Sequence, residues 1–171
     1  DGGLDGVWTD GSAGSDLDYI KITTGVGSII SADCSNASSN CNGLSTPQLV
    51  DLNGDKVADR AYAGDLQGNM WAFDLTTANE GTWDIAYKQG GTAKPLFTAT
   101  NASLPQPITN KPILVKHPDG LGGDPDLLVF FGTGQYLTNS DITNTNLQAF
   151  YGVWDNGAHS LTPSDLVEQT F

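Results

Sequence analysis

The chain has 171 residues, enough for one medium-sized domain with a hydrophobic core, and its 20 acidic and 7 basic residues give a formal net charge of −13. This charge argues against a nucleic-acid-binding protein, because neutralising phosphates requires clustered lysine and arginine. With 21 glycines, 8 prolines and aspartate dominating the acids, the composition indicates many turns and few helices.

The chain begins with DGGLDGVWTD, which is acidic and glycine-rich, unlike a signal peptide. We therefore interpret residues 1–171 as an excerpt of a longer precursor, with no second domain. No apolar run reaches the roughly 18 residues of a membrane-spanning helix, so no transmembrane segment is predicted.

The first predicted strand is DYIKITTG (18–25), where polar and apolar residues alternate. A polar loop, DCSNASSNC, follows and contains both cysteines, Cys34 and Cys41. Their spacing fits a short surface disulfide, which would imply an oxidising compartment, and two free thiols are the alternative. Without a nearby histidine, the pair makes a poor zinc site.

The segment VDLNGDKVAD (50–59) places hard oxygen donors at alternating positions. Calcium accepts six to eight oxygen ligands, which three monodentate side chains, one backbone carbonyl and a bidentate aspartate would nearly supply. Gly54 would allow the chain to wrap tightly. The loop 51–59 therefore predicts a Ca²⁺ site whose ligands are Asp51, Asn53, Asp55, the Val57 carbonyl and Asp59.

This loop differs from an EF-hand, because Lys56 stands at the glycine position, Tyr62 stands at the final glutamate position, and no helix flanks it. The alternative is a solvated acidic turn without an ion. In that case its three aspartates would repel one another at close range.

Four further runs have the alternating pattern of strands: ADRAYAGD (58–65), NMWAFDLTT (69–77), DLLVFFGTGQYL (126–137) and QAFYGVWDNG (148–157). The continuous LLVFF predicts a strand buried on both faces. The only helix-like segment is the C-terminal SDLVEQTF, where Ser164 could cap a short turn. Strand-and-turn units recurring every 40 to 50 residues or so predict an all-β fold, a partial β-propeller of about three to four blades.

The ordered motifs resemble one known family. NGLSTPQLVDLNGDKVADRAYAGDLQGNMWAFDL, PLFTA, QPIT, KPILVKHP, VFFGTGQYL and QAFYGVWDNG are together similar to the C-terminal region of PilY-type (PilC) type IV pilus biogenesis factors and tip adhesins. The similarity extends over residues 42–157. It implies a modified β-propeller with a surface calcium loop, whose ligands carry over to Asp51, Asn53, Asp55, Val57 and Asp59.

The resemblance further implies a role in pilus extension and retraction and in surface attachment. No nucleophile elbow, Cys–His pair or P-loop occurs in the sequence, so we expect no enzymatic activity. The expected partners are minor pilins or other pilus machinery and a host or abiotic surface. The expected location is the bacterial cell surface, at the pilus tip or outer membrane, reached through the periplasm. Two alternatives remain: an integrin-α-like calcium propeller module and a fragment of a quinone-dependent propeller dehydrogenase.

Overall fold

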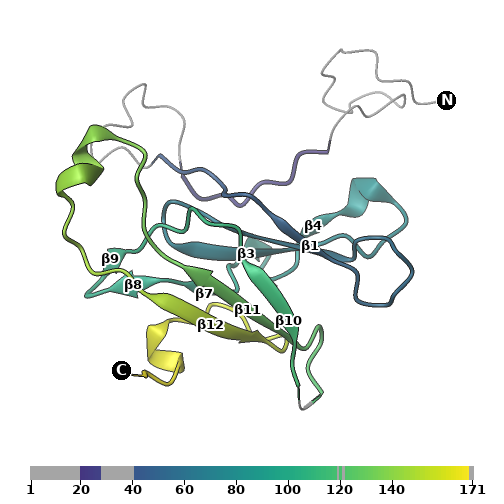
Figure 1. Cartoon of the computed structure of the whole chain (residues 1–171). Coiled ribbons are helices and arrows are strands. Elements are labelled where there is room, and N and C mark those ends of the chain that lie inside the picture. The colour runs from purple at the N-terminus through teal and green to yellow at the C-terminus, as the bar shows by residue number, and fades with distance from the viewer. Residues whose placement is uncertain (1–19, 28–40, 119, 121, 170–171) are drawn as a thin grey trace.

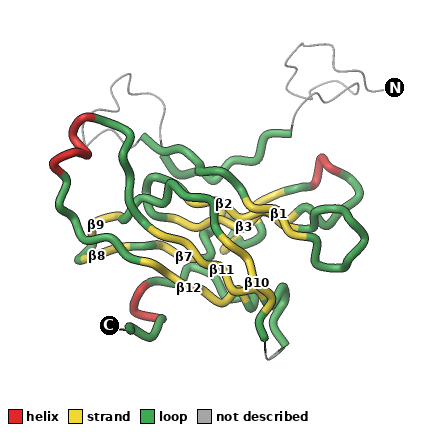
Figure 2. The backbone as a smooth tube through the Cα atoms, viewed as in Figure 1, coloured by secondary structure: helices red, strands yellow, loops and turns green. Residues whose placement is uncertain are grey.

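The computed structural model describes residues 20–27, 41–118, 120 and 122–169. Short strands joined by long loops make up this part of the chain (Figures 1 and 2). The strands are β1 (Gln48–Val50), β2 (Arg60–Gly64), β3 (Asn69–Asp74), β4 (Asp84–Ile85), β5 (Lys88–Gln89), β6 (Thr92–Ala93), β7 (Phe97–Thr98), β8 (Thr100–Asn101), β9 (Leu104–Pro105), β10 (Ile113–Lys116), β11 (Leu127–Gly132) and β12 (Phe150–Asp155). Three short 3-10 turns accompany them: η1 (Glu80–Thr82), η2 (Asn139–Thr143) and η3 (Pro163–Asp165).

Two antiparallel sheets form the framework. The first has the order β1-β2-β3-β4, with β7 also pairing with β3, and the second has the order β10-β11-β12. Two small hairpins, β5-β6 and β8-β9, lie outside them. The all-β arrangement of short antiparallel sheets is therefore the fold class that the sequence predicted.

The two sheets share one hydrophobic core. Tyr62, Met70 and Ala72 of the first sheet belong to the same buried cluster as Val129, Phe131 and Val153 of the second. A second cluster lies on the other face of the first sheet, around Ala61, Ala63, Trp71, Phe73 and Ile85. Strand β3 thus separates two cores and is buried on both faces from residue 69 to residue 73.

Three local predictions were wrong. LLVFF in β11 alternates between buried and partly exposed side chains, because only one face of the second sheet meets the shared core. Of the strand predicted at 18–25, residues 20–25 form no strand, and the rest lies outside the described residues. Near the C-terminus, Thr162 rather than Ser164 caps the short turn, in a reciprocal pairing with Asp165.

A buried carboxylate, Asp65, organises the turn between β2 and β3. Its side chain is fully buried and accepts hydrogen bonds from the backbone of Gln67 (2.9 Å) and Asn69 (2.8 Å) and from the indole of Trp71 (2.8 Å). The side-chain amides of Asn69 and Asn42 also donate to it, at 3.0 and 2.8 Å. Burying a charge is costly unless such donors surround it, so this set offsets the loss of hydration.

A second buried carboxylate, Asp155, joins the two sheets. It ends β12 and accepts hydrogen bonds from the hydroxyls of Tyr62 in β2 (2.7 Å) and Tyr87. Arg60 donates to the Tyr87 oxygen at 3.3 Å. Burial and the nearby Asp155 charge raise the pKa of both tyrosine hydroxyls.

Replacing Asp65 should destabilise the fold strongly. Asp65→Ala leaves several buried donors without an acceptor, and we expect a loss of at least about 3 kcal/mol in the free energy of unfolding. Asn42→Ala, which removes one donor to Asp65 and the oxygen that accepts from the Leu66 amide, should cost less, about 1–2 kcal/mol. Urea denaturation measures both, with the exposed Glu168→Ala as a control that should change little. Equal stability of Asp65→Ala and the parent chain would contradict this account.

Stability should also fall at alkaline pH. The pKa values of Tyr62 and Tyr87 lie above the ordinary value of 10.0 in the folded chain, so the unfolded chain loses these protons first as the pH rises. The tyrosines' contribution is therefore complete below about pH 10 and declines above it. Thermal melts between pH 8 and 11, followed by tyrosinate absorbance, measure the effect. Tyr62→Phe should weaken this dependence, whereas Tyr136→Phe, at an exposed tyrosine, should leave it intact.

Candidate metal site

The predicted calcium loop connects β1 to β2 and projects from the body of the molecule beside β1, on the right of Figure 1. Its ends are fixed by the sheet, because Val50 pairs with Arg60 across the two strands. The amide of Asp59 donates to the Val50 carbonyl at 2.9 Å, and the Asp59 carbonyl accepts from Leu75 at 2.8 Å. The loop is therefore closed by backbone hydrogen bonds at its base.

Within the loop, side-chain oxygens accept hydrogen bonds from amides further along the chain. The Asp51 carboxylate accepts from Gly54 at 2.6 Å and from Lys56 at 2.8 Å. Asn53 Oδ1 accepts from the amide of Asp55, and Asp55 Oδ1 from the amide of Val57, both at 2.8 Å. These contacts curl the backbone around its own acidic side chains.

The same amides act on the acidity of Asp51. The N–H groups of Lys56 and then Gly54 stabilise its ionised form and lower the pKa of this carboxyl below its ordinary value. Asp51 is thus charged at neutral pH, as a calcium ligand must be.

Asp59 differs from the other loop acids because it is buried, with 7% of its surface exposed. Its Oδ2 accepts from the amides of Leu52 at 2.6 Å and Asn53 at 3.3 Å. The Asn53 side-chain amide lies 3.4 Å from the other oxygen, Oδ1. Within the described residues, Lys88 and Asp84 form the one ion pair. The Asp59 carboxylate is therefore stabilised by amide donors and not by a cationic side chain.

Two residues with positive φ make the curl of the loop possible. Gly54 has φ of 84° and Lys56 has φ of 75°. Glycine adopts this left-handed conformation without cost, whereas a residue with a Cβ does not. A Cβ on Gly54 would meet no atom within 4 Å, so backbone conformation alone favours glycine there.

The loop contains the oxygen ligands that calcium prefers, at the spacing expected of a calcium loop, and all five predicted ligands lie in it. However, no three acidic, histidine or cysteine side chains in the described part of the chain converge as a metal-binding group. The acids instead bind amides. Each carboxylate oxygen has two lone pairs, so an oxygen that accepts one amide retains capacity for an ion. Calcium binding would therefore require the acidic side chains to move together.

The remaining sequence predictions fall outside this loop. Cys41 is disulfide-bonded, and its expected partner, Cys34, lies outside the described residues. No helix among residues 20–27, 41–118, 120 and 122–169 has the length and apolar character needed to cross a membrane. A pocket lies between the 105–107 and 134–148 segments, where the sequence predicted no site. The density of asparagine, glutamine and threonine in TNSDITNTNLQ (138–148) was the available signal.

Comparisons with known proteins identify a family. A family model described as the PilY1 beta-propeller domain matches residues 8–169. The type IV pilus biogenesis factor PilY1 of Pseudomonas aeruginosa is 42% identical over 129 residues, covering 67% of this chain and 11% of its own length. A PilY1 homolog of Xylella fastidiosa is 36% identical over 119 residues, covering 68% of this chain and 8% of its own.

A solved structure agrees with these relatives. The crystal structure of the Pseudomonas aeruginosa PilY1 C-terminal domain matches with a TM-score of 0.57 and 39% identity, over 72% of this chain and 28% of that one. The comparisons confirm both the resemblance seen in the sequence motifs and the partial-propeller fold. The chain spans only 11% of the length of the Pseudomonas relative.

The two positions with positive φ should respond to substitution in opposite directions. Lys56→Gly removes the strain of a side chain at a left-handed residue and should raise the free energy of unfolding by up to about 1 kcal/mol. Gly54→Ala introduces the same strain and should lower it by about 1 kcal/mol. Chemical denaturation in the presence of a chelator measures both. A destabilised Lys56→Gly would contradict the loop conformation described above.

Proposed function

The chain belongs to the PilY1 β-propeller domain family, and we propose that it is a calcium-binding, non-enzymatic propeller segment of a type IV pilus biogenesis factor. The protein would support pilus extension and retraction and attachment to surfaces. The proposal that the chain binds calcium rests on the 51–59 loop. This loop holds five potential oxygen ligands in a curl that the first sheet closes at its base.

In this proposal Asp51, Asn53, Asp55, Asp59 and the Val57 carbonyl hold Ca²⁺. The ion would neutralise the acidic side chains and draw them together. Asp59 would transmit the effect of the bound ion to the fold, since it immediately precedes β2 and its backbone forms hydrogen bonds with Val50 and Leu75. Calcium would thereby stabilise the β2–β3 hairpin and set the surface that meets the pilus machinery.

The family also guides the proposed partners and location. We assign contacts with minor pilins or other pilus machinery and with a host or abiotic surface. The protein would reach the bacterial cell surface, at the pilus tip or outer membrane, through the periplasm. The disulfide-bonded Cys41 supports an oxidising compartment of this kind.

We further propose that residues 1–171 are the C-terminal part of a larger propeller. The outer face of the second sheet supports this, because it carries exposed apolar side chains at Ile113 (63%), Val115 (46%) and Phe150 (72%). Phe130 stacks on Phe150 on that face, with ring centroids 6.2 Å apart. Large exposed apolar patches mark surfaces that other elements cover, here a neighbouring sheet of the longer protein.

Calcium titration of the chelator-treated chain tests the metal proposal. We expect one site by calorimetry and a higher melting temperature with calcium. At 100 times the dissociation constant the gain is about 2.7 kcal/mol, or about 5–10 °C for a chain of this size. Asp59→Asn should abolish most of the binding heat, whereas Glu168→Gln, which removes an exposed charge elsewhere, should leave it unchanged.

Absence of calcium heat in the parent chain would overturn the metal site. The pilus role is tested separately, by placing Asp59→Asn in a full-length protein of this family and measuring piliation and surface motility. Normal motility beside a proven loss of calcium binding would contradict the proposed link between the loop and pilus function.

A further inference from the structure

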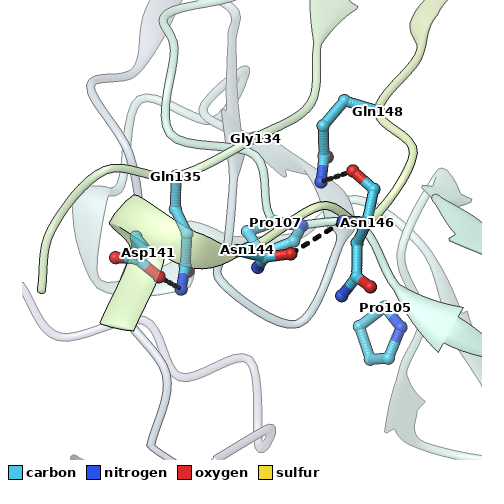
Figure 3. A pocket seen from close by; sticks show the side chains of 8 residues that line it. All are labelled: Pro105, Pro107, Gly134, Gln135, Asp141, Asn144, Asn146 and Gln148. Carbon is cyan, nitrogen blue, oxygen red and sulfur yellow. Dashed lines mark hydrogen bonds between the residues drawn. The ribbon is translucent and has the colours of Figure 1, made fainter. Parts of the chain in front are cut away.

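A small polar pocket lies on the connection between β11 and β12, far along the chain from the calcium loop. It has a volume of about 160 Å³ (Figure 3). Two prolines and a glycine, Pro105, Pro107 and Gly134, supply its apolar lining. Its polar lining consists of Gln135, Asp141, Asn144, Asn146 and Gln148. At this size it is well below the roughly 300 Å³ of a site for a drug-sized ligand.

The connection that builds the pocket, residues 133–149, is much longer than the roughly two residues that a tight antiparallel hairpin needs. Ordered connections of this length are usually functional. Asp141 holds this one in place, accepting hydrogen bonds from the amides of Leu137 and Thr138 and from the Gln135 side chain, each at 2.8 Å.

Four amide side chains give the pocket both donors and acceptors. Gln135 donates to Asp141, and Gln148 Nε2 donates to the Asn146 carbonyl at 3.2 Å, as the dashed lines in Figure 3 show. Asn144 Oδ1 accepts from the Asn146 amide at 2.9 Å. The Asn146 side-chain amide, Asn144 Nδ2 and the side-chain oxygens of Gln135 and Gln148 form no hydrogen bond with the described residues.

The charge of the pocket narrows the ligand class. No lysine, arginine or histidine is among its lining residues in the described chain, so it lacks the groups that bind phosphate, sulfate or carboxylate. The hydrogen bonds that Asp141 accepts, first of all the one from the Leu137 amide, lower the pKa of its carboxyl to about 2. This carboxyl is therefore ionised at neutral pH. Its oxygens accept from Gln135, Leu137 and Thr138, which hold the loop together. Asp141 is the one acidic residue among the described lining residues, and a single carboxylate makes a poor site for a divalent cation.

We propose that this pocket binds a neutral sugar residue of a glycan. Each sugar hydroxyl is both a donor and an acceptor, and the pocket offers four side-chain amides with both capacities beside one carboxylate, that of Asp141. The site lies outside the 51–59 loop and does not depend on the proposed calcium function.

Saturation-transfer NMR with methyl glycosides of galactose, glucose and mannose and with N-acetylglucosamine tests the proposal. We expect transfer to at least one neutral sugar, with a dissociation constant on the order of 1 mM, because an exposed pocket must compete with water. The anionic 3′-sialyllactose should not bind through its sialic acid. Binding should persist in the presence of a calcium chelator, which separates this site from the metal loop.

Matched variants assign the binding to the pocket. Asn146→Ala removes an amide of the lining and should weaken binding about tenfold. Asn139→Ala changes the same residue type in the same connection, outside the lining, and should leave binding unchanged. Both positions are exposed, so both variants should keep the parent melting temperature.

A separate binding experiment identifies the source of the glycan, because host glycans and bacterial polysaccharides contain the same neutral sugars. Lactosamine oligosaccharides represent host glycans, and fragments of a bacterial exopolysaccharide represent bacterial ones. Tighter binding of either set supports the site and identifies the source of its ligand. Lack of transfer to every neutral sugar, or equal binding by Asn146→Ala and the parent chain, would overturn the proposal. Transfer only to a short asparagine-rich peptide would overturn it in favour of a peptide site.

Discussion

The buried carboxylate of Asp65 is the interaction on which the first sheet depends. It lies at the turn between β2 and β3, and it collects donors from the turn itself, from the indole of Trp71 and from Asn42. Its backbone carbonyl also accepts from Ile108 at 2.9 Å. Asp65 therefore stabilises the hairpin turn, orients a core tryptophan and, through its side chain and its backbone carbonyl, anchors two other segments. The resulting hairpin carries the acidic loop at the far end of β2.

The chain uses its acidic residues in two physically different ways. Asp65 and Asp155 are fully buried and satisfied by protein donors, so they hold segments together without a cation. Asp51, Asp55 and Asp59 are instead gathered in one loop, where amides curl the backbone around them. A net charge of −13 is thus compatible with a packed core because some of the acids are structural acceptors and others remain on loops.

The two candidate binding features occupy connections rather than strands. The acidic loop joins β1 to β2, and the amide-lined pocket lies on the connection from β11 to β12, toward the opposite side of the view in Figure 1. Loops positioned by a rigid scaffold commonly carry binding residues, since they can vary without disturbing a core. Here the shared core between the sheets provides that scaffold, and the Asp155 contacts with Tyr62 and Tyr87 join its two halves.

The sequence by itself determined the strand identity of β2, β3, β11 and β12, the family, and the composition of the acidic loop. Those features are local: alternation, turn residues and ligand spacing all lie within short segments. The burial of LLVFF was predicted wrongly from the sequence, because the sheets that pack against this strand decide whether one of its faces is covered or both. Only the tertiary structure revealed the roles of Asp65 and Asp155 and the pocket, since each joins residues that are distant in the chain. A linear pattern specifies what a segment can form, but partners brought together by folding decide what that segment contacts.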